Sequence, residues 1–325
     1  MKYFITGATG FIGGRLARQL REAGHEVIAV VRNPVKAQDL AQMGVTLHQG
    51  DVTEKESMRE PMRGVDGVFH VAGWYKVGAK DKSQAYAINV DGTRNVLELM
   101  QELGIRKGVY TSTLAVNSNT HGVEADETYR FSGKHLSVYD QTKAEAHEVA
   151  LTKIKEGLPL VIVQPGLVYG PGDTSSVRES LIQYLKKQLP AIPSVTAYSW
   201  GHIEDIAHAH TLAMEKGRAG EAYNICGETH TLADMFKMAQ EISGVRGPMV
   251  VPPVMMRVMS ALVTPIDWML PLPGAYTAEG LRILAGVTYI GSNAKARREL
   301  GYDPRPLRDG LKTTLDHEMK LLGMK

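Results

Sequence analysis

The sequence has a single cysteine, almost no net charge and no long uninterrupted apolar run. Cys226 alone excludes an internal disulfide and a multi-cysteine metal site, which fits a reducing cytosol. The 37 basic and 35 acidic residues leave a net charge of +2, which gives no electrostatic footprint for nucleic acid or an anionic membrane. The most apolar region, residues 250–272, contains Arg257, Asp267 and several prolines, so we expect no membrane span. We therefore expect a cytoplasmic protein.

The histidines and carboxylates of the sequence do not have the spacing of a metal site. His208 and His210 are two residues apart on an expected helix, so they point to different faces. No carboxylate and histidine pair has a convincing ligand spacing, and we expect no metal site. What the chain does have is length, because 325 residues can bury a substantial core and suggest two domains.

The first thirteen residues carry the clearest local signal. A short apolar strand, residues 1–6, ends in Gly7-Ala8-Thr9-Gly10-Phe11-Ile12-Gly13 and opens an amphipathic helix over about 11–23. A strand that ends in a glycine-rich turn and begins a helix is how a parallel sheet binds a dinucleotide pyrophosphate. Gly7 permits the tight turn, Gly10 lets the backbone approach the phosphates, and Gly13 allows the helix to pack closely on the strand. We take residues 7 and 9–13 as candidate cofactor contacts.

Apolar runs alternate with helical patterns along the first half of the chain. This alternation indicates βαβ units, and near-continuous apolar strands suit a parallel sheet covered by helices on both faces. Strands are expected at residues 1–6, 27–31, 45–48, 68–71, 109–112 and 160–163. Helices are expected at residues 11–23, 34–42, 83–103 and 137–155. The sequence therefore predicts an α/β fold with a Rossmann-type doubly wound parallel sheet.

The pattern breaks at residues 165–173, where prolines and glycines gather. Helices dominate beyond this point, with two further strands expected at residues 198–203 and 221–226. We therefore expect a nucleotide-binding domain over residues 1–170, which the chain re-enters at about 198–228. Residues 171–197 and 229–325 are expected to form a smaller, mostly helical, substrate-binding lobe.

The end of the second expected strand indicates which nucleotide is preferred. Arg32 follows Gly13 by 19 residues, close to the spacing at which an acidic residue would bind a ribose 2′-hydroxyl. An arginine there suits a 2′-phosphate instead, with Lys36 and Arg15 as weaker helpers, so NADP(H) is favoured over NAD(H). Asp51 is placed to reach an adenine edge or to cap a helix, and Val52 could add an apolar contact.

Tyr139 and Lys143 are four residues apart on an expected helix, so their side chains share a face. A free tyrosine has a pKa near about 10, and a nearby ammonium should lower that pKa and make proton exchange easier. The fifth expected strand runs into Thr111-Ser112-Thr113, whose hydroxyls could hold a substrate oxygen. Together these residues predict an acid/base site at the carboxyl ends of the strands.

Several segments together resemble the extended short-chain dehydrogenase/reductase family, within the NAD-dependent epimerase/dehydratase superfamily. They are residues 6–13, Asp51, 89–95, Ser112-Thr113, Tyr139 with Lys143, 165–173, 202–207 and 291–301. Residues 30–34 are most similar to the dihydroflavonol-4-reductase-like branch, which also includes 3β-hydroxysteroid-type members. The resemblance spans nearly the whole chain. Gln164 departs from the arginine that often precedes the following proline.

The resemblance assigns roles to residues of this sequence. Thr113, with Ser112 beside it, would be the hydroxyl that stabilises substrate charge, Tyr139 the acid/base and Lys143 its ribose-binding activator. Further cofactor contacts would come from the segment beneath the nicotinamide ribose and from the backbone that lines the nicotinamide. These are Val71, Ala72, Gly73, Pro165, Gly166 and Val168. Members of the family often pair through helices that flank the sheet, which makes a homodimer an option.

Three functions remain open. The first is an NADP(H)-dependent oxidoreductase that reduces a ketone or aldehyde or oxidises the alcohol. The second is a nucleotide-sugar epimerase or dehydratase with bound NAD, against which stand Arg32 and the residues Leu114-Ala115 after Thr113. The third is a non-catalytic NADP-binding regulator, which would typically lack Tyr139 or Lys143. The methionine-rich second half hints at an apolar small-molecule substrate, with Trp74, Tyr75, Met249 and residues 255–257 as candidate walls or, alternatively, core residues.

Overall fold

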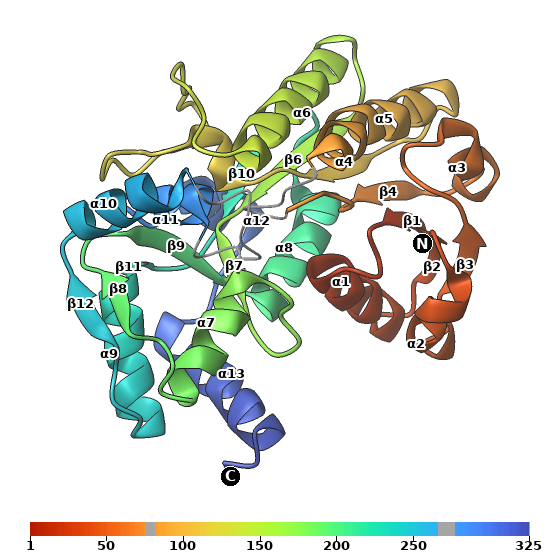
Figure 1. Ribbon diagram of the computed structural model, residues 1–325. Helices are drawn as coiled ribbons and strands as arrows, with labels where there is room; N and C mark the ends of the chain where they lie inside the picture. Colours follow the sequence, from red (N-terminus) through yellow and green to blue (C-terminus); the bar gives the residue numbers. More distant parts are fainter. Residues whose placement is uncertain (76–81, 266–276, 325) are drawn as a thin grey trace.

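The computed structural model of the protein describes residues 1–75, 82–265 and 277–324. A parallel sheet lies at its centre, with helices on both faces and a smaller lobe beside it (Figure 1). The predicted Rossmann-type α/β fold is confirmed. The seven strands of the main sheet are β1 (Lys2–Thr6), β2 (Glu26–Val31), β3 (Thr46–Gln49), β4 (Gly67–His70), β5 (Gly108–Thr111), β6 (Leu160–Pro165) and β10 (Ala222–Ile225).

The strand order is β10-β6-β5-β4-β1-β2-β3, and every neighbouring pair is parallel. The order reverses at β1, which pairs with β2 on one side and with β4 on the other. Ligands of such sheets bind at the carboxyl ends of the strands beside this reversal. The topology therefore brings the Gly7 turn and the segment after His70 to one edge of the sheet.

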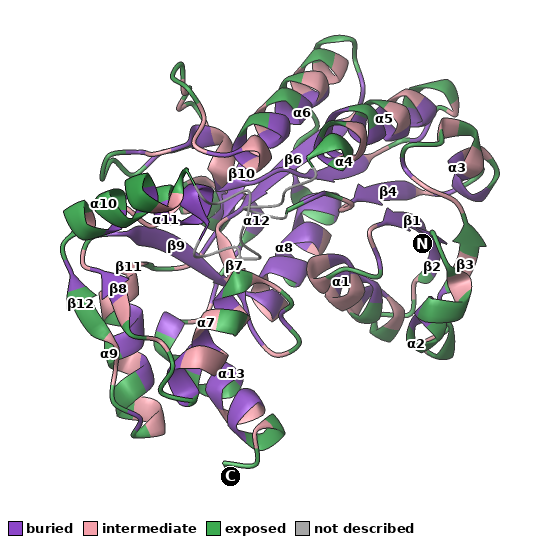
Figure 2. Cartoon of the chain, viewed as in Figure 1, coloured by how far each residue is buried: buried purple, intermediate pink, exposed green. Residues whose placement is uncertain are grey.

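Helices cover each face of the sheet because the strands are apolar on both sides. One core joins the sheet to α1 (Phe11–Glu22), α8 (Ile203–Lys216) and α12 (Ala294–Leu300). The other core joins it to α3 (Lys55–Met62), α5 (Gly92–Glu102) and α6 (Val138–Lys155). The strands at the centre of the sheet are mainly buried (Figure 2). The shorter helical elements of this part are η1 (Pro34–Ala37), α2 (Gln38–Gln42), α4 (Ser83–Tyr86), η2 (Ala87–Asp91) and η3 (Leu114–Asn117).

The expected helix over residues 83–103 forms, but it is divided. A stretch of π-helix, η2, separates α4 from α5. Isolated π-helical turns within α-helices are often found at functional sites. The inserted turn changes which side chains face the sheet edge, with consequences for Asn89 described below.

The smaller lobe is built on further strands that the sequence reading largely missed. A second sheet has the order β11-β9-β13, with β7 also paired to β9, and β12 pairs with β8. The bounds are β7 (Leu167–Tyr169), β8 (Ala191–Pro193), β9 (Ala197–His202), β11 (Thr229–Thr231), β12 (Met249–Val251) and β13 (Thr288–Tyr289). The helices are α7 (Ser176–Leu185), α9 (Leu232–Ser243), α10 (Pro253–Val263), α11 (Ala278–Ile283) and α13 (Leu307–Leu321). The strand expected at residues 198–203 is thus β9 of the second sheet, whereas α8 and β10 return to the first.

Candidate functional site

The glycine turn between β1 and α1 has the geometry of an anion cradle. Gly7 has a φ of +74°, and a Cβ there would lie 2.6 Å from the backbone nitrogen of Ala72. A Cβ at Gly13 would overlap the carbonyl oxygen of Gly7. Gly10 is the N-cap of α1, where no side chain caps the helix and no acidic residue occupies the first turn. The N–H groups of the helix N-terminus are therefore free to bind a pyrophosphate.

The other predicted contacts of this turn lie beside it. Thr9 is exposed, and Phe11 and Ile12 are partly buried in the first turn of α1. Arg15, expected to help with a phosphate, instead forms an ion pair with Glu204 of α8 and donates to the carbonyl oxygen of Pro171 at 3.2 Å. Arg15 thus ties α1 to α8, and its help with a phosphate stays a prediction.

Arg32 follows β2 and is exposed at the same edge of the sheet. Within residues 1–75, 82–265 and 277–324 its guanidinium makes no hydrogen bond or ion pair. The Asn33 side chain accepts from the backbone nitrogens of Val35 and Lys36, at 3.0 and 3.3 Å, and so begins η1. The exposed Lys36 side chain lies on this short helix. Two cations thus flank the second strand end without a competing acidic partner among the described residues.

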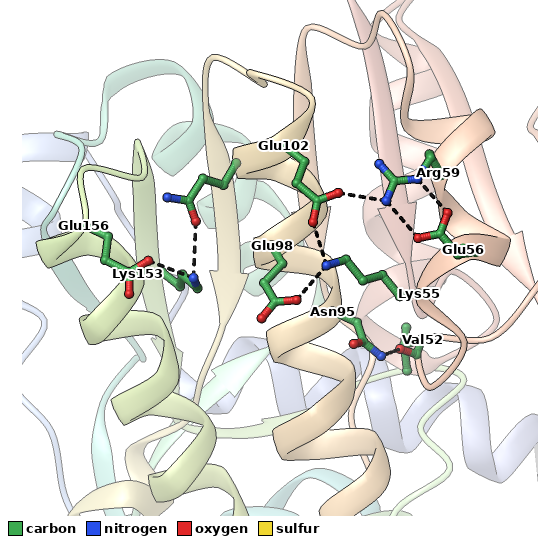
Figure 3. A network of polar contacts seen from close by, with 10 residues as sticks. Val52, Lys55, Glu56, Arg59, Asn95, Glu98, Glu102, Lys153 and Glu156 are labelled. Atoms are coloured by element: carbon green, nitrogen blue, oxygen red, sulfur yellow. Dashed lines mark hydrogen bonds and ion pairs between the residues drawn. The ribbon is translucent and has the colours of Figure 1, made fainter.

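Asp51 and Val52 lie beyond β3. One Asp51 carboxylate oxygen accepts from both the backbone nitrogen and the hydroxyl of Thr53, each at 2.9 Å, so it stabilises a turn rather than capping α3 directly. Val52 is buried, and its carbonyl oxygen accepts from Asn95 Nδ2 at 2.9 Å (Figure 3). Ion pairs of Lys55 and Arg59 with Glu102 join α3 to α5 next to this contact. The backbone at Val52 is therefore held by α5, which ion pairs join to α3.

A buried hydrogen-bond chain links the glycine turn to Lys143. The Thr6 hydroxyl accepts from the backbone nitrogens of Val71 and Ala72, at 3.2 and 3.1 Å, so its own proton is donated to His70 Nδ1 at 2.8 Å. His70 Nε2 then carries a proton toward the Thr93 hydroxyl, 2.9 Å away. Burial lowers the pKa of His70 to about 3, so the ring is neutral, as expected of a packed structural histidine.

The chain continues from Thr93 to Tyr110 and ends at Lys143. Tyr110 is hydrogen-bonded to Thr93 and stacks on the His70 ring at a centroid distance of 5.4 Å. Lys143 Nζ donates to the Tyr110 hydroxyl at 3.2 Å and to the carbonyl oxygen of Thr111 at 2.8 Å. Burial lowers the pKa of Lys143 to about 7. The ammonium is thus held at the carboxyl end of β5 by the strand and by Tyr110.

Tyr139 lies one turn before Lys143 on α6 and is hydrogen-bonded to Thr113. Burial raises the pKa of Tyr139 to about 12, although the Thr113 hydrogen bond lowers that pKa and the Asp140 carboxylate raises it further. The predicted lowering of the Tyr139 pKa by Lys143 is therefore wrong for the free protein. The cause is burial, which outweighs the Thr113 hydrogen bond, while the Lys143 ammonium is hydrogen-bonded to Tyr110 and Thr111.

The Ser112 hydroxyl is engaged elsewhere and not with Tyr139. That hydroxyl is hydrogen-bonded to Nδ1 of His147, one turn beyond Lys143 on α6, at a distance of 2.8 Å. Burial lowers the pKa of His147 to about 4 and keeps its ring neutral. The Ser112–His147 pair therefore fixes β5 against α6, and Thr113 is the hydroxyl beside Tyr139.

Asn89, a site residue that the sequence reading did not single out, lies in the π-helical turn η2. Its Oδ1 accepts from the backbone nitrogen of Trp74 at 2.7 Å, and its Nδ2 donates to the Trp74 carbonyl oxygen at 3.0 Å. Nδ2 also donates to the Thr142 hydroxyl of α6 at 2.9 Å. One buried amide thus fixes the segment after Gly73 against the helix that carries Tyr139. In the sequence, Asn89 could have been found as a polar residue at an inward position of the helix expected at residues 83–103.

We expect Asn89→Ala to lower the free energy of unfolding by about 2–4 kcal/mol, because it leaves two buried backbone groups of Trp74 without partners. Asn95→Ala is the matched control, since Asn95 Nδ2 makes the single bond to Val52 described above and should cost about 1 kcal/mol. Urea denaturation of both variants measures the difference. Equal losses in the two variants would contradict the role given to Asn89.

The remaining predicted cofactor contacts lie at the same edge of the sheet. Val71 and Ala72 are held by hydrogen bonds to Thr6. Gly73 is exposed, and a Cβ built on it would lie 3.9 Å from Lys143 Nζ. Pro165 ends β6, and the backbone nitrogen of Gly166 donates to the Ile225 carbonyl oxygen at 3.3 Å. Val168 lies in β7 of the second sheet. The structure therefore gathers the ends of β1, β4, β5 and β6 around Tyr139 and Lys143.

The candidate substrate walls are not gathered there. Trp74 is buried, whereas Tyr75 is exposed and its hydroxyl lies 3.1 Å from that of Thr174. Met249, Met255 and Arg257 are exposed. Met256 is buried in the small core between α10 and α11, which fits the alternative of core packing. Of these candidates, Trp74 follows β4 and is bonded to Asn89, so it is the one placed beside the Tyr139 edge of the sheet.

Cys226 and His210, whose side chains could serve as a nucleophile or a metal ligand, are both buried. Cys226 is buried, and burial raises its pKa to about 12. His210 is buried with hydrogen bonds to Thr111 and to the Ile206 carbonyl oxygen. Over the described ranges of the chain, no group of three or more His, Cys, Asp or Glu side chains is arranged to hold a metal ion. None of the described helices is both long and apolar enough to cross a membrane.

Comparison with known proteins is consistent with this geometry. Residues 3–226 match the family described as the NAD dependent epimerase/dehydratase family. The chain is 31% identical to a candidate dihydroflavonol 4-reductase of Synechocystis sp., over 95% of this chain and 92% of that protein. It is 28% identical to a farnesyl-dihydroquinoline-oxide ketoreductase of Stigmatella aurantiaca, over 94% of this chain and 92% of the other. The crystal structure of gox2253 superposes with a TM-score of 0.86 at 30% identity, covering 99% of this chain and 98% of that one.

Proposed function

Because this chain belongs to the NAD dependent epimerase/dehydratase family and is an NAD(P)-dependent enzyme of the short-chain dehydrogenase/reductase type, we propose that it is an NADP(H)-dependent carbonyl reductase. In the reverse direction it would oxidise the corresponding alcohol. The observation that carries the proposal is the pairing of Tyr139 with Thr113 at the sheet edge that also holds the Gly7 turn and Lys143.

The residues at this edge fit a dinucleotide. The free N-terminus of α1 would hold the pyrophosphate, and a side chain at Gly7 or Gly13 would fill the space needed by the turn. Arg32 would bind the 2′-phosphate, and Asp51 has one carboxylate oxygen not used by Thr53 to meet the adenine. Lys143 would bind the nicotinamide ribose. Bound in this position, NADPH would supply the hydride.

Tyr139 would donate its phenolic proton to the substrate oxygen. A pKa of about 12 keeps the phenol protonated at neutral pH, which suits the reducing direction. The Thr113 hydroxyl would share the same oxygen and stabilise the charge that develops on it. We assign Ser112 a positioning role, because its hydroxyl is bonded to His147.

We further propose an apolar carbonyl substrate and a cytoplasmic location. The name of the Stigmatella relative, a ketoreductase for a farnesyl-bearing compound, supports an apolar substrate. The cofactor would be held by residues 1–170 with the returning α8 and β10. Residues 171–197 and 229–325 would complete the substrate-binding site. The second sheet also takes strands from outside the substrate ranges, because β7 lies within residues 1–170 and β9 spans residues 197–202.

We expect Arg32→Ala to weaken NADPH binding by about tenfold or more while NADH binding stays unchanged. A charge-assisted hydrogen bond contributes about 1.5–3 kcal/mol, and each 1.4 kcal/mol is about tenfold in affinity. Fluorescence titration of wild type and variant with both nucleotides measures the effect. Arg63→Ala is the control, since Arg63 is an exposed arginine at the end of α3, paired with Glu60. Tighter wild-type binding of NADH than of NADPH would overturn the preference.

A further inference from the structure

Helix α10 presents apolar side chains to solvent. Val254 is 58% exposed, Val258 54% and Leu262 68%, and these residues follow one another at intervals of four, on one face of the helix. Met255 and Met259 extend the face on one side. A surface helix normally turns such residues toward the core and polar residues outward. In Figure 2 the helix lies at the periphery of the smaller lobe with mainly exposed residues.

The orientation of α10 is fixed from its other face. Met256 is buried with Val251 and Leu281 in a small core, and the buried Ser260 hydroxyl donates to the Ala278 carbonyl oxygen at 2.8 Å. Rotation of the helix to bury Val258 would break this hydrogen bond and expose Met256. The outward apolar face is therefore set by contacts with α11.

The apolar surface continues beyond the helix. Met249 and Val250 of β12 are exposed, as is Val195, which follows β8. A Cβ at Gly286 would meet both Pro253 and Val195, so these segments are adjacent in space. We call this surface the α10 face. It consists of Val195, Met249, Val250, Val254, Met255, Val258, Met259 and Leu262.

The segments that form and adjoin the α10 face carry exposed arginines. Arg246, Arg257 and Arg282 are exposed, and in the described part of the chain none of them forms an ion pair. The one acidic residue of residues 244–265 and 277–286 is Glu279, which is buried and paired with Lys82 at 3.0 Å. The near-neutral charge of the whole chain conceals this local excess of unpaired arginines.

We propose that the α10 face binds the surface of an anionic lipid bilayer. Exposed valine, methionine and leucine side chains would enter the boundary between headgroups and acyl chains, and the three arginines would meet lipid phosphates. A second copy of the chain is the weaker fit, because a symmetric contact would place the arginines of two copies against one another. The contact is a peripheral one, since no described helix is able to cross a membrane. Binding in this manner does not depend on the proposed enzymatic function.

Co-sedimentation of the full-length protein with vesicles tests the proposal. One set of vesicles is phosphatidylcholine alone, and in the other about a quarter of the lipid is phosphatidylglycerol. We expect the wild type to bind the anionic vesicles more strongly, and Val258→Glu to reduce that binding by about tenfold or more. Leu321→Glu is the matched control, because Leu321 is 60% exposed at the end of α13, and it should bind like the wild type.

Two results would overturn the proposal. One is sedimentation with vesicles that is absent, or that is equal for the wild type and Val258→Glu. The other is self-association without lipid, seen by analytical ultracentrifugation and abolished by Val258→Glu, which would assign the α10 face to a second copy. If circular dichroism shows that Val258→Glu does not fold, Leu262→Ser on the same face replaces it in the same experiment. Reduction of a water-soluble ketone by the variants separates this outcome from failure of the proposed enzymatic function.

Discussion

Tyr139→Phe is expected to lower kcat for carbonyl reduction by about 10²–10⁴-fold, with little change in NADPH affinity. The variant keeps the ring but removes the hydroxyl that is bonded to Thr113 and that we propose as the proton donor. Steady-state kinetics with a carbonyl substrate and a separate nucleotide titration measure the two effects. The change should appear in kcat, because the lost interaction belongs to the transition state.

Tyr110→Phe is the matched control for this experiment. Tyr110 is also buried at the site, but its hydroxyl only accepts from Lys143 and bonds to Thr93. Its loss should cost less than about tenfold in kcat and should move the pH dependence that belongs to Lys143 to lower pH, because the charged ammonium loses one acceptor. A near-wild-type rate in Tyr139→Phe would remove Tyr139 from the mechanism.

Lys143→Met is expected to abolish most activity and to change how stability depends on pH. Burial holds the pKa of Lys143 at about 7, below its value of 10.5 in the unfolded chain. Between these two values the unfolded state binds more protons, so the contribution of this lysine to stability rises with pH from about 7 to 10.5. The variant lacks that dependence. Relative to wild type, Lys143→Met should therefore be more stable at pH 6.5 than at pH 9.5, by about 1–3 kcal/mol.

Urea denaturation at the two pH values measures this difference. Lys153→Met is the control, because Lys153 lies on the same helix and is paired at the surface with Glu156, so its replacement should change neither activity nor the pH dependence. A stability difference between Lys143→Met and wild type that is the same at both pH values would show that Lys143 is not held with a lowered pKa.

The main sheet and its cofactor turn were predictable from the sequence because both depend on local pattern. Most of the first six strands are rich in buried apolar residues, with the edge strand β3 as the exception, and the spacing of Gly7, Gly10 and Gly13 reports a backbone geometry that other residues would obstruct. The short strands of the smaller lobe were missed. β7, β8, β11, β12 and β13 have two or three residues each, too few for a periodic pattern, and they pair with segments far away in sequence.

The site was predictable as a set of residues but not as a network. Spacing places Tyr139 and Lys143 on one face of α6, yet it does not tell that Lys143 donates to Tyr110 and Thr111, or that Ser112 bonds to His147. The π-helical turn at Asn89 was equally hidden, because an inserted residue shifts the helical register without changing composition. Burial decides the direction of the pKa shift of Tyr139, Lys143 and His147, and helical spacing does not report burial, so the predicted lowering of the Tyr139 pKa was wrong.

The most direct measurement of the central claim is the fate of deuterium in NADPH that is labelled at both C4 positions. The purified protein is incubated with the labelled nucleotide and a panel of apolar ketones and aldehydes, and the products are analysed by mass spectrometry. Our account predicts loss of NADPH and an alcohol that carries one deuterium on the former carbonyl carbon. Absence of net NADPH consumption, together with NAD that co-purifies with the protein and interconversion of a nucleotide sugar, would contradict it and favour an epimerase.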